Sequence, residues 1–65
     1  MRLCVNGEVR EVSAQTLDAL LVELGYESAT LATALNQTFV RGQDRARTKL
    51  REGDAVEIVS PRQGG

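Results

Sequence analysis

Residues 16–25 read TLDALLVELG, and they decide the fold because the hydrophobic period changes there from that of strands to that of a helix. Four leucines at spacings of three and four residues form one stripe of an amphipathic helix. They are Leu17, Leu20, Leu21 and Leu24. Thr16 can cap the first amide groups, Asp18 complements the positive end of the helix dipole, and Gly25 can end the helix in the left-handed conformation. We predict a core-facing helix that has no chemical role.

The segment before the helix, residues 1–12, has the pattern of a β-hairpin. Its first half alternates apolar with other residues, as a half-buried strand does. Asn6-Gly7 then supplies the positive φ angles of a two-residue hairpin turn. Val9 and Val12 differ in parity, so the second strand either contains a bulge or turns one valine toward water.

Three further strands are predicted after the helix. Residues 31–35 alternate, residues 38–40 follow a turn at Asn36-Gln37, and the last strand follows a turn at Gly53-Asp54. Residues 41–49 have no clear period, so we predict a loop there with room for one helical turn.

In the last strand we expect Val56 and Ile58 to point into the core, because they alternate with Glu57 and Val59. Glu57 and Val59 would then point outward beside the C-terminal tail. We predict that these two residues form a partner face.

The order of these elements, β-β-α-β-β-β, predicts a two-layer α+β domain in which one helix packs on one face of a mixed five-stranded sheet. The helix provides the long crossover that parallel pairing of the first and last strands at the sheet centre requires. We expect residues 1–60 to form this domain and residues 61–65 to be a flexible tail that ends in Gly-Gly.

Length and composition exclude several classes of protein. A chain of 65 residues buries only about 60% of the surface that its unfolded form exposes, so it has no room for a deep active-site cleft. A net charge of −1 with only Tyr26 and Phe39 as aromatic residues argues against nucleic-acid binding. The single cysteine cannot form an internal disulfide, which favours a reducing, cytoplasmic setting. No signal peptide or membrane-spanning run is evident.

The side chains offer little catalytic chemistry. The sequence has no histidine, so the usual acid-base group at neutral pH and metal sites built on histidine or several cysteines are absent. We interpret the glutamates as surface charges and Cys4 as a structural residue. We therefore expect no intrinsic enzymatic activity and no bound metal.

Residues 41–51, RGQDRARTKLR, carry much of the positive charge. They are either a solvated loop or a docking patch for an acidic partner. In both cases we expect Arg41, Arg45 and Arg47 to be exposed.

The terminal Gly64-Gly65 pair places a single chemical group at the end of the chain, the carboxylate of Gly65. This carboxylate is ionised at neutral pH and is a poor electrophile until adenylation turns one oxygen into part of a leaving group. Glycines let the backbone enter a narrow channel where a Cβ would collide. Pro61 restricts the base of the tail.

The whole chain resembles the small sulfur-carrier proteins of thiamine biosynthesis, the ThiS family, which have the ubiquitin-like β-grasp fold. The matching pieces are VNG at 5–7, TLDALLVELG at 16–25, TALN at 33–36, LREGDAVEIVS at 50–60 and the terminal Gly-Gly. The chain differs from the usual family pattern at Val40-Arg41-Gly42, often Val-Pro-Arg, and at residues 44–46, near which many members have a tryptophan.

The resemblance implies that an E1-like enzyme uses ATP and Mg²⁺ to adenylate Gly65, contacting the tail at Gly64, Gln63 and Arg62. Sulfur that comes ultimately from a cysteine desulfurase would displace AMP and leave a thiocarboxylate. Thiazole synthase would then receive the sulfur. The free carrier is expected to be a monomer that binds neither membrane nor nucleic acid.

Three alternatives share much of this pattern. A sulfur carrier for molybdopterin synthesis or another pathway would use the same activation chemistry with a different acceptor. A ubiquitin-like modifier would join its tail to a lysine of a target protein. A plain interaction domain would not need its terminal glycines.

Overall fold

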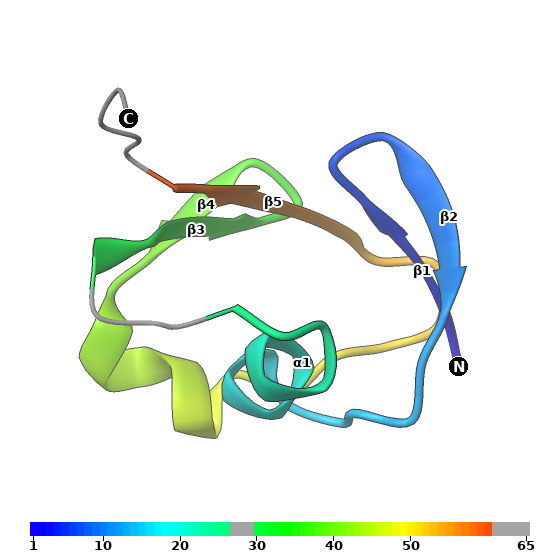
Figure 1. Ribbon diagram of the computed structural model, residues 1–65, viewed down its shortest axis with the longest axis horizontal. Helices are drawn as coiled ribbons and strands as arrows, with labels where there is room; N and C mark the ends of the chain where they lie inside the picture. The colour runs from blue at the N-terminus through cyan, green and yellow to red at the C-terminus, as the bar shows by residue number, and fades with distance from the viewer. Residues whose placement is uncertain (27–29, 61–65) are drawn as a thin grey trace.

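The computed structural model describes residues 1–26 and 30–60. Within these residues, a five-stranded sheet forms one layer, and helix α1 with a short 3₁₀ helix forms the other (Figure 1). The elements are β1 (Arg2–Val5), β2 (Glu8–Glu11), α1 (Leu17–Glu23), β3 (Ala32–Leu35), β4 (Thr38–Val40), the 3₁₀ helix η2 (Gly42–Arg47) and β5 (Ala55–Val59). The strand order is β2-β1-β5-β3-β4. The central strand β5 runs parallel to β1 and antiparallel to β3, which confirms the predicted mixed sheet.

The hairpin turns are those that the sequence predicts. Asn6 and Gly7 have φ angles of 51° and 83°, and the second turn places Asn36 and Gln37 at 50° and 72°. Strands β1 and β2 pair residue for residue with no bulge. Of the two possibilities, a bulge or an exposed valine, the second is therefore the right one, because Val9 points to water.

Val12 lies just beyond the end of β2 and turns inward, where it is buried. Its amide donates a hydrogen bond to the carbonyl oxygen of Met1 at 2.8 Å. The irregular parity of this segment thus marks the point where the chain leaves the sheet for the helix.

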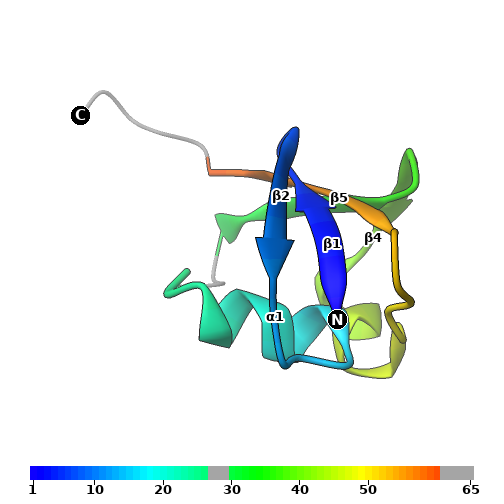
Figure 2. The ribbon, with the colours of Figure 1, turned by 90° about the vertical axis from the view of Figure 1, so that its right-hand side faces the viewer.

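Helix α1 begins and ends as the sequence predicts. The Oγ1 of Thr16 accepts a hydrogen bond from the Ala19 amide at 3.2 Å, and Gly25 has a φ angle of 84° after the last turn. The helix lies across one face of the sheet (Figure 2). Its leucine stripe faces the strands, because Leu17, Leu20 and Leu21 are each no more than 1% exposed.

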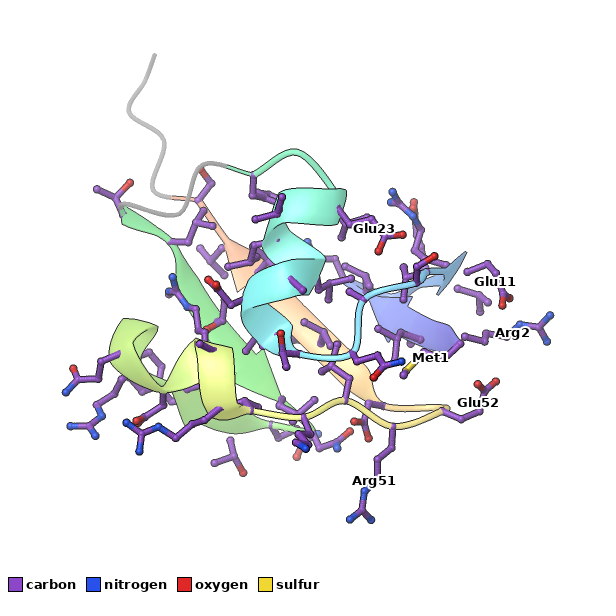
Figure 3. The ribbon with its side chains drawn as sticks, turned by 90° about the horizontal axis from the view of Figure 1, so that it is seen from below. Met1, Arg2, Glu11, Glu23, Arg51 and Glu52 are labelled. Atoms are coloured by element: carbon purple, nitrogen blue, oxygen red, sulfur yellow. The ribbon has the colours of Figure 1, made fainter. Side chains whose placement is uncertain are left out.

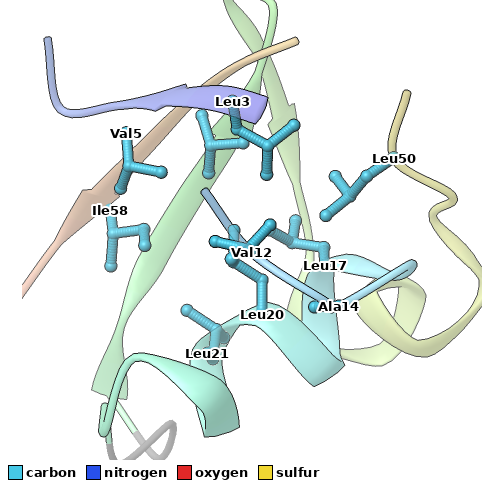
Figure 4. Close-up of a cluster of buried hydrophobic side chains, with 10 residues drawn as sticks. Leu3, Val5, Val12, Ala14, Leu17, Leu20, Leu21, Leu50 and Ile58 are labelled. Carbon is cyan, nitrogen blue, oxygen red and sulfur yellow. The ribbon is translucent and has the colours of Figure 1, made fainter. Parts of the chain in front are cut away.

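The core fills the space between these two layers (Figure 4). Inward-facing residues of β1 and β5 meet the leucines of the helix, and Leu50 closes one end. The cluster consists of Leu3, Val5, Val12, Ala14, Leu17, Leu20, Leu21, Leu50, Val56 and Ile58. Val56 and Ile58 point inward and Glu57 and Val59 outward, as predicted. Burial of this apolar surface is the main stabilising contribution in a chain with no internal disulfide.

The basic segment contains one buried arginine, so the prediction that Arg45 is exposed was wrong. Six residues form η2, and Arg45 extends from it beneath the sheet, where it is only 6% exposed. Its Nε donates to Thr33 Oγ1 at 3.1 Å and its Nη2 to the Leu31 carbonyl oxygen at 2.7 Å. Thr33 in turn donates to the carbonyl oxygen of Val40 at 2.9 Å. A guanidinium can be buried at such a position because several acceptors satisfy its donors.

The other two arginines of η2 and its N-cap, Arg47 and Arg41, are exposed as predicted. Arg41 Nε donates to Asp44 Oδ2 at 2.9 Å, and Arg47 Nε lies 3.7 Å from Asp44 Oδ1. The hydrogen bond from Arg41 holds the pKa of Asp44 below its ordinary value of 3.8. The carboxylate therefore offsets part of the positive charge of this segment at neutral pH.

Candidate functional site

The candidate site lies on the outer face of the sheet, the face that points away from α1. Cross-strand pairing brings its residues together, because Val59 of β5 lies opposite Ala32 of β3, and Glu57 lies opposite Ala34. Ala34 in turn lies opposite Phe39 of the edge strand β4. All five side chains point to this face because successive residues of a strand alternate between faces.

These residues enclose a shallow, mostly apolar hollow of about 110 Å³. The hollow arises because two small alanines lie between larger neighbours. Phe39 is 66% exposed and Val59 is 60% exposed. Exposed apolar side chains that gather around a hollow commonly mark a surface for another protein.

The residues that line this hollow are suited to binding another molecule rather than to catalysis. Of the described residues that line it, Glu57 is the one with an ionisable side chain. Among the described residues, no group of three or more histidine, cysteine, aspartate or glutamate side chains could hold a metal ion. The same part of the chain contains no helix with the length and apolar character needed to cross a bilayer. The hollow can accept an apolar side chain of a partner and place a carboxylate beside it.

The structure brings together the two residues predicted to form the partner face, Val59 and Glu57. Both are exposed, and both line the hollow. Val59 is followed by Ser60, the last residue of the described range. The predicted tail contacts Arg62, Gln63 and Gly64, and the predicted reactive residue Gly65, lie outside the described residues.

Sequence reasoning missed Phe39. Strand β4 has only three residues, so its sequence alone does not show which of them faces outward. The pairing of Phe39 with Ala34 places its ring on the hollow. The exposure of the Phe39 ring is the structural signal that it belongs to a binding surface, because a large aromatic residue is usually expected to contribute to the core.

Comparison with known proteins identifies relatives of the whole chain. The model of the ThiS family matches residues 3–65. The sulfur carrier protein ThiS of Thermus thermophilus is 39% identical over 61 residues, which cover 94% of this chain and 95% of that protein. A protein of Paramagnetospirillum magneticum described as thiazole synthase is 41% identical over 66 residues; the match covers this whole chain but only 20% of that protein.

Solved structures agree with the fold. The crystal structure of the thiamine biosynthesis protein ThiS from Geobacter metallireducens superposes with a TM-score of 0.84 at 29% identity, and the match covers 100% of both chains. A solution structure from the same organism gives the same score and identity. The ubiquitin-like β-grasp fold predicted from the resemblance is thus confirmed, and the chain belongs to the ThiS family.

Proposed function

We propose that the chain carries sulfur for thiazole formation in thiamine biosynthesis, and that it holds the sulfur as a thiocarboxylate on Gly65. The observation that carries this proposal is the match of the ThiS family to residues 3–65, because it reaches the terminal Gly-Gly itself. The Thermus relative, described as a sulfur carrier, matches over nearly its full length. The chain is accordingly a carrier whose chemistry is performed by other enzymes.

The chemistry begins at the Gly65 carboxylate. One of its oxygens attacks the α-phosphate of ATP, which is bound with Mg²⁺ by an E1-like enzyme, and pyrophosphate leaves. A persulfide, formed ultimately by a cysteine desulfurase, then attacks the acyl carbon and displaces AMP, and a thiol reductant cleaves the resulting acyl disulfide to release the thiocarboxylate. The thiocarboxylate gives its sulfur to the acceptor, and water supplies the oxygen that regenerates the carboxylate.

The outer face of the sheet is our candidate for the surface that the E1-like enzyme binds. The hollow beside Val59 and Phe39 can accept an apolar side chain, and Glu57 can pair with a cation at its rim. In the sequence, Ser60 alone separates Val59 from the tail. Docking here would leave Arg62, Gln63 and Gly64 to enter the channel that leads to the ATP site.

Thiazole synthase is our candidate for the acceptor. A protein described as thiazole synthase contains a segment similar to this entire chain, which supports a close association of the two functions. Carrier and acceptor would then meet in the cytoplasm, where the lone Cys4 stays reduced. The free carrier is proposed to be a monomer.

The decisive experiment is sulfur loading followed by intact mass measurement. The parent, given the E1-like enzyme, ATP and a sulfur donor, is expected to exchange one oxygen for sulfur. Deletion of Gly65 shortens the reach of the carboxylate by about 3.3 Å, and misplacement by even about 1 Å can cost roughly a hundredfold in rate. Gly64→Val keeps the length but adds a branched side chain. We expect neither variant to acquire sulfur.

A glycine substitution away from the tail serves as the control. A Cβ at Gly42 would meet Arg45 Nη1 at 3.7 Å, an ordinary contact, so Gly42→Ala should load like the parent. All of these variants should melt near the parent temperature, because changes at a chain terminus usually cost little stability and the added Cβ at Gly42 makes only ordinary contacts. Normal loading of the chain that lacks Gly65 would refute the thiocarboxylate mechanism.

A further inference from the structure

The side chain of Asn6 makes two hydrogen bonds to the backbone of β5. Its Oδ1 accepts from the Ile58 amide at 2.8 Å, and its Nδ2 donates to the Ile58 carbonyl oxygen at 3.2 Å. Asn6 itself lies in the turn between β1 and β2, with a φ angle of 51°. These contacts connect the first hairpin to the end of β5 across 52 residues of sequence.

The geometry shows that this carboxamide replaces a missing peptide group. The Cys4 amide donates to the Asp54 carbonyl oxygen and the Asn6 amide to the Val56 carbonyl oxygen, both at 2.9 Å. In an evenly spaced parallel ladder the next bonds would run to Ile58. The chain turns away at Asn6-Gly7 before it can make them. A carboxamide has the same donor and acceptor as a peptide group, so it can continue the ladder by one step.

The consequence is local to the end of β5. Without the carboxamide, the amide and carbonyl groups of Ile58 that face β1 would lose the partners described here. The loss matters because Ile58 is a buried residue, 5% exposed. Ile58 immediately precedes Val59, which lines the hollow. Together with the pairing of Val59 opposite Ala32, these bonds hold the end of β5 in the sheet and fix where Val59 points.

We propose that Asn6 is a positioning residue for activation of the carrier. It keeps the end of β5 ordered before the activating enzyme binds, so that the partner does not bear the cost of ordering it. This inference rests on the proposed function, since it assigns to Asn6 a role in presenting Val59 and the tail.

The chain offers a matched control at the other end of the same strand. Asn36 also lies in a hairpin turn, with a φ angle of 50°. Its Oδ1 accepts from the Ala55 amide at 2.9 Å, and its Nδ2 donates to Asp54 Oδ1 at 3.0 Å. Asn36 thus holds the start of β5 as Asn6 holds its end, roughly 10 Å away along an extended strand.

The test compares Asn6→Gly with Asn36→Gly as substrates of the activating enzyme, measured by ATP-dependent pyrophosphate release. Glycine tolerates the positive φ angle at both positions, so each change removes the side-chain contacts without straining the turn. We expect Asn6→Gly to raise KM for the carrier about fivefold with kcat unchanged, because one backbone residue must then be ordered on binding. Asn36→Gly should stay within about twofold of the parent.

Amide exchange supplies a readout that does not depend on the enzyme. The Ile58 amide should exchange faster in Asn6→Gly, and the Ala55 amide should exchange faster in Asn36→Gly. Asn6→Asp keeps the acceptor but loses the Nδ2 donor, and its KM should lie between those of the parent and Asn6→Gly.

Equal KM values for Asn6→Gly and the parent, or equal increases for the two glycine variants, would overturn the positioning role while the carrier function stands. Failure of the parent itself to be adenylated would instead overturn the proposed function and this role with it.

Discussion

At the residue scale, neighbours near the end of β5 have opposite environments. Ile58 is 5% exposed in the core, whereas Val59 is 60% exposed on the outer face. The two residues differ by a single step along the strand, and a sheet sends successive side chains to opposite faces. A single change at either position therefore tests a different property, stability at Ile58 and partner binding at Val59.

Ile58→Asp should unfold the domain, because it removes a packed apolar side chain from the core and places a charge among the apolar residues that surround it. The expected loss in the free energy of unfolding is about 3 kcal/mol or more, a large share of the stability of so small a domain. Val59→Asp should keep the melting temperature near that of the parent and weaken binding to the activating enzyme at least about tenfold. Thermal melts measure the stability of each variant, and titration of the activating enzyme with each variant measures binding. The reverse assignment of the two phenotypes would mean that the strand register is wrong by one residue.

At the scale of elements, the connection from β2 to α1 is held by the far end of the helix. Glu23, in the last turn of α1, accepts hydrogen bonds at Oε1 from the Ala14 amide at 2.8 Å and at Oε2 from the Ser13 amide at 3.0 Å. Figure 3 shows Glu23 beside the helix. Its interpretation as a plain surface charge was thus incomplete, because its carboxylate satisfies two backbone donors of the connection.

Glu23→Ala should therefore destabilise the protein although Glu23 is an exposed residue. We expect a loss of about 1–2 kcal/mol, since hydrogen bonds to a charged acceptor are strong but solvent weakens exposed ones. Glu8→Ala is the control, because the described part of the structure gives Glu8 no side-chain hydrogen bond, and its effect should stay within about 0.5 kcal/mol. Urea unfolding with an unchanged m-value measures both. Equal effects of the two changes would show that the Glu23 contacts contribute nothing.

At the scale of the whole molecule, the two layers separate two kinds of surface. The apolar hollow lies on the outer face of the sheet. The backbone of η2 lies in the layer of α1 (Figures 1 and 2). The basic segment is thus outside the hollow. Its charges can act on an acidic partner through long-range attraction, which salt screens over about 8–10 Å.

Reversal of Arg41 and Arg47 to glutamate should slow association with the activating enzyme several-fold at low salt and have little effect at high salt. Stopped-flow association rates at several salt concentrations measure this. The melting temperature should change little, because pairs between exposed charges contribute about 1 kcal/mol or less. Association rates that do not depend on these charges at any salt concentration would leave the segment as a solvated surface. Arg45 is excluded from this test because its guanidinium is buried.

The sequence by itself determined most of the elements. The leucine stripe of α1, the turn at Asn6-Gly7 and the alternation along β5 each depend on residues a few positions apart, and the structure has all of them. The Gly65 carboxylate, by contrast, stays a prediction made from the sequence. Resemblance of the matching pieces then identified the family.

Only the tertiary structure decided which residues meet across the fold. Phe39 joins the hollow through sheet pairing, Arg45 reaches Thr33 beneath the sheet, and Asn6 continues the ladder to Ile58. The physical reason is separation along the chain. Propensities and periods express interactions between near neighbours, whereas these contacts join positions as far as 52 residues apart. Sheet order and register bring these residues together. A local sequence pattern does not show which distant residues will become neighbours.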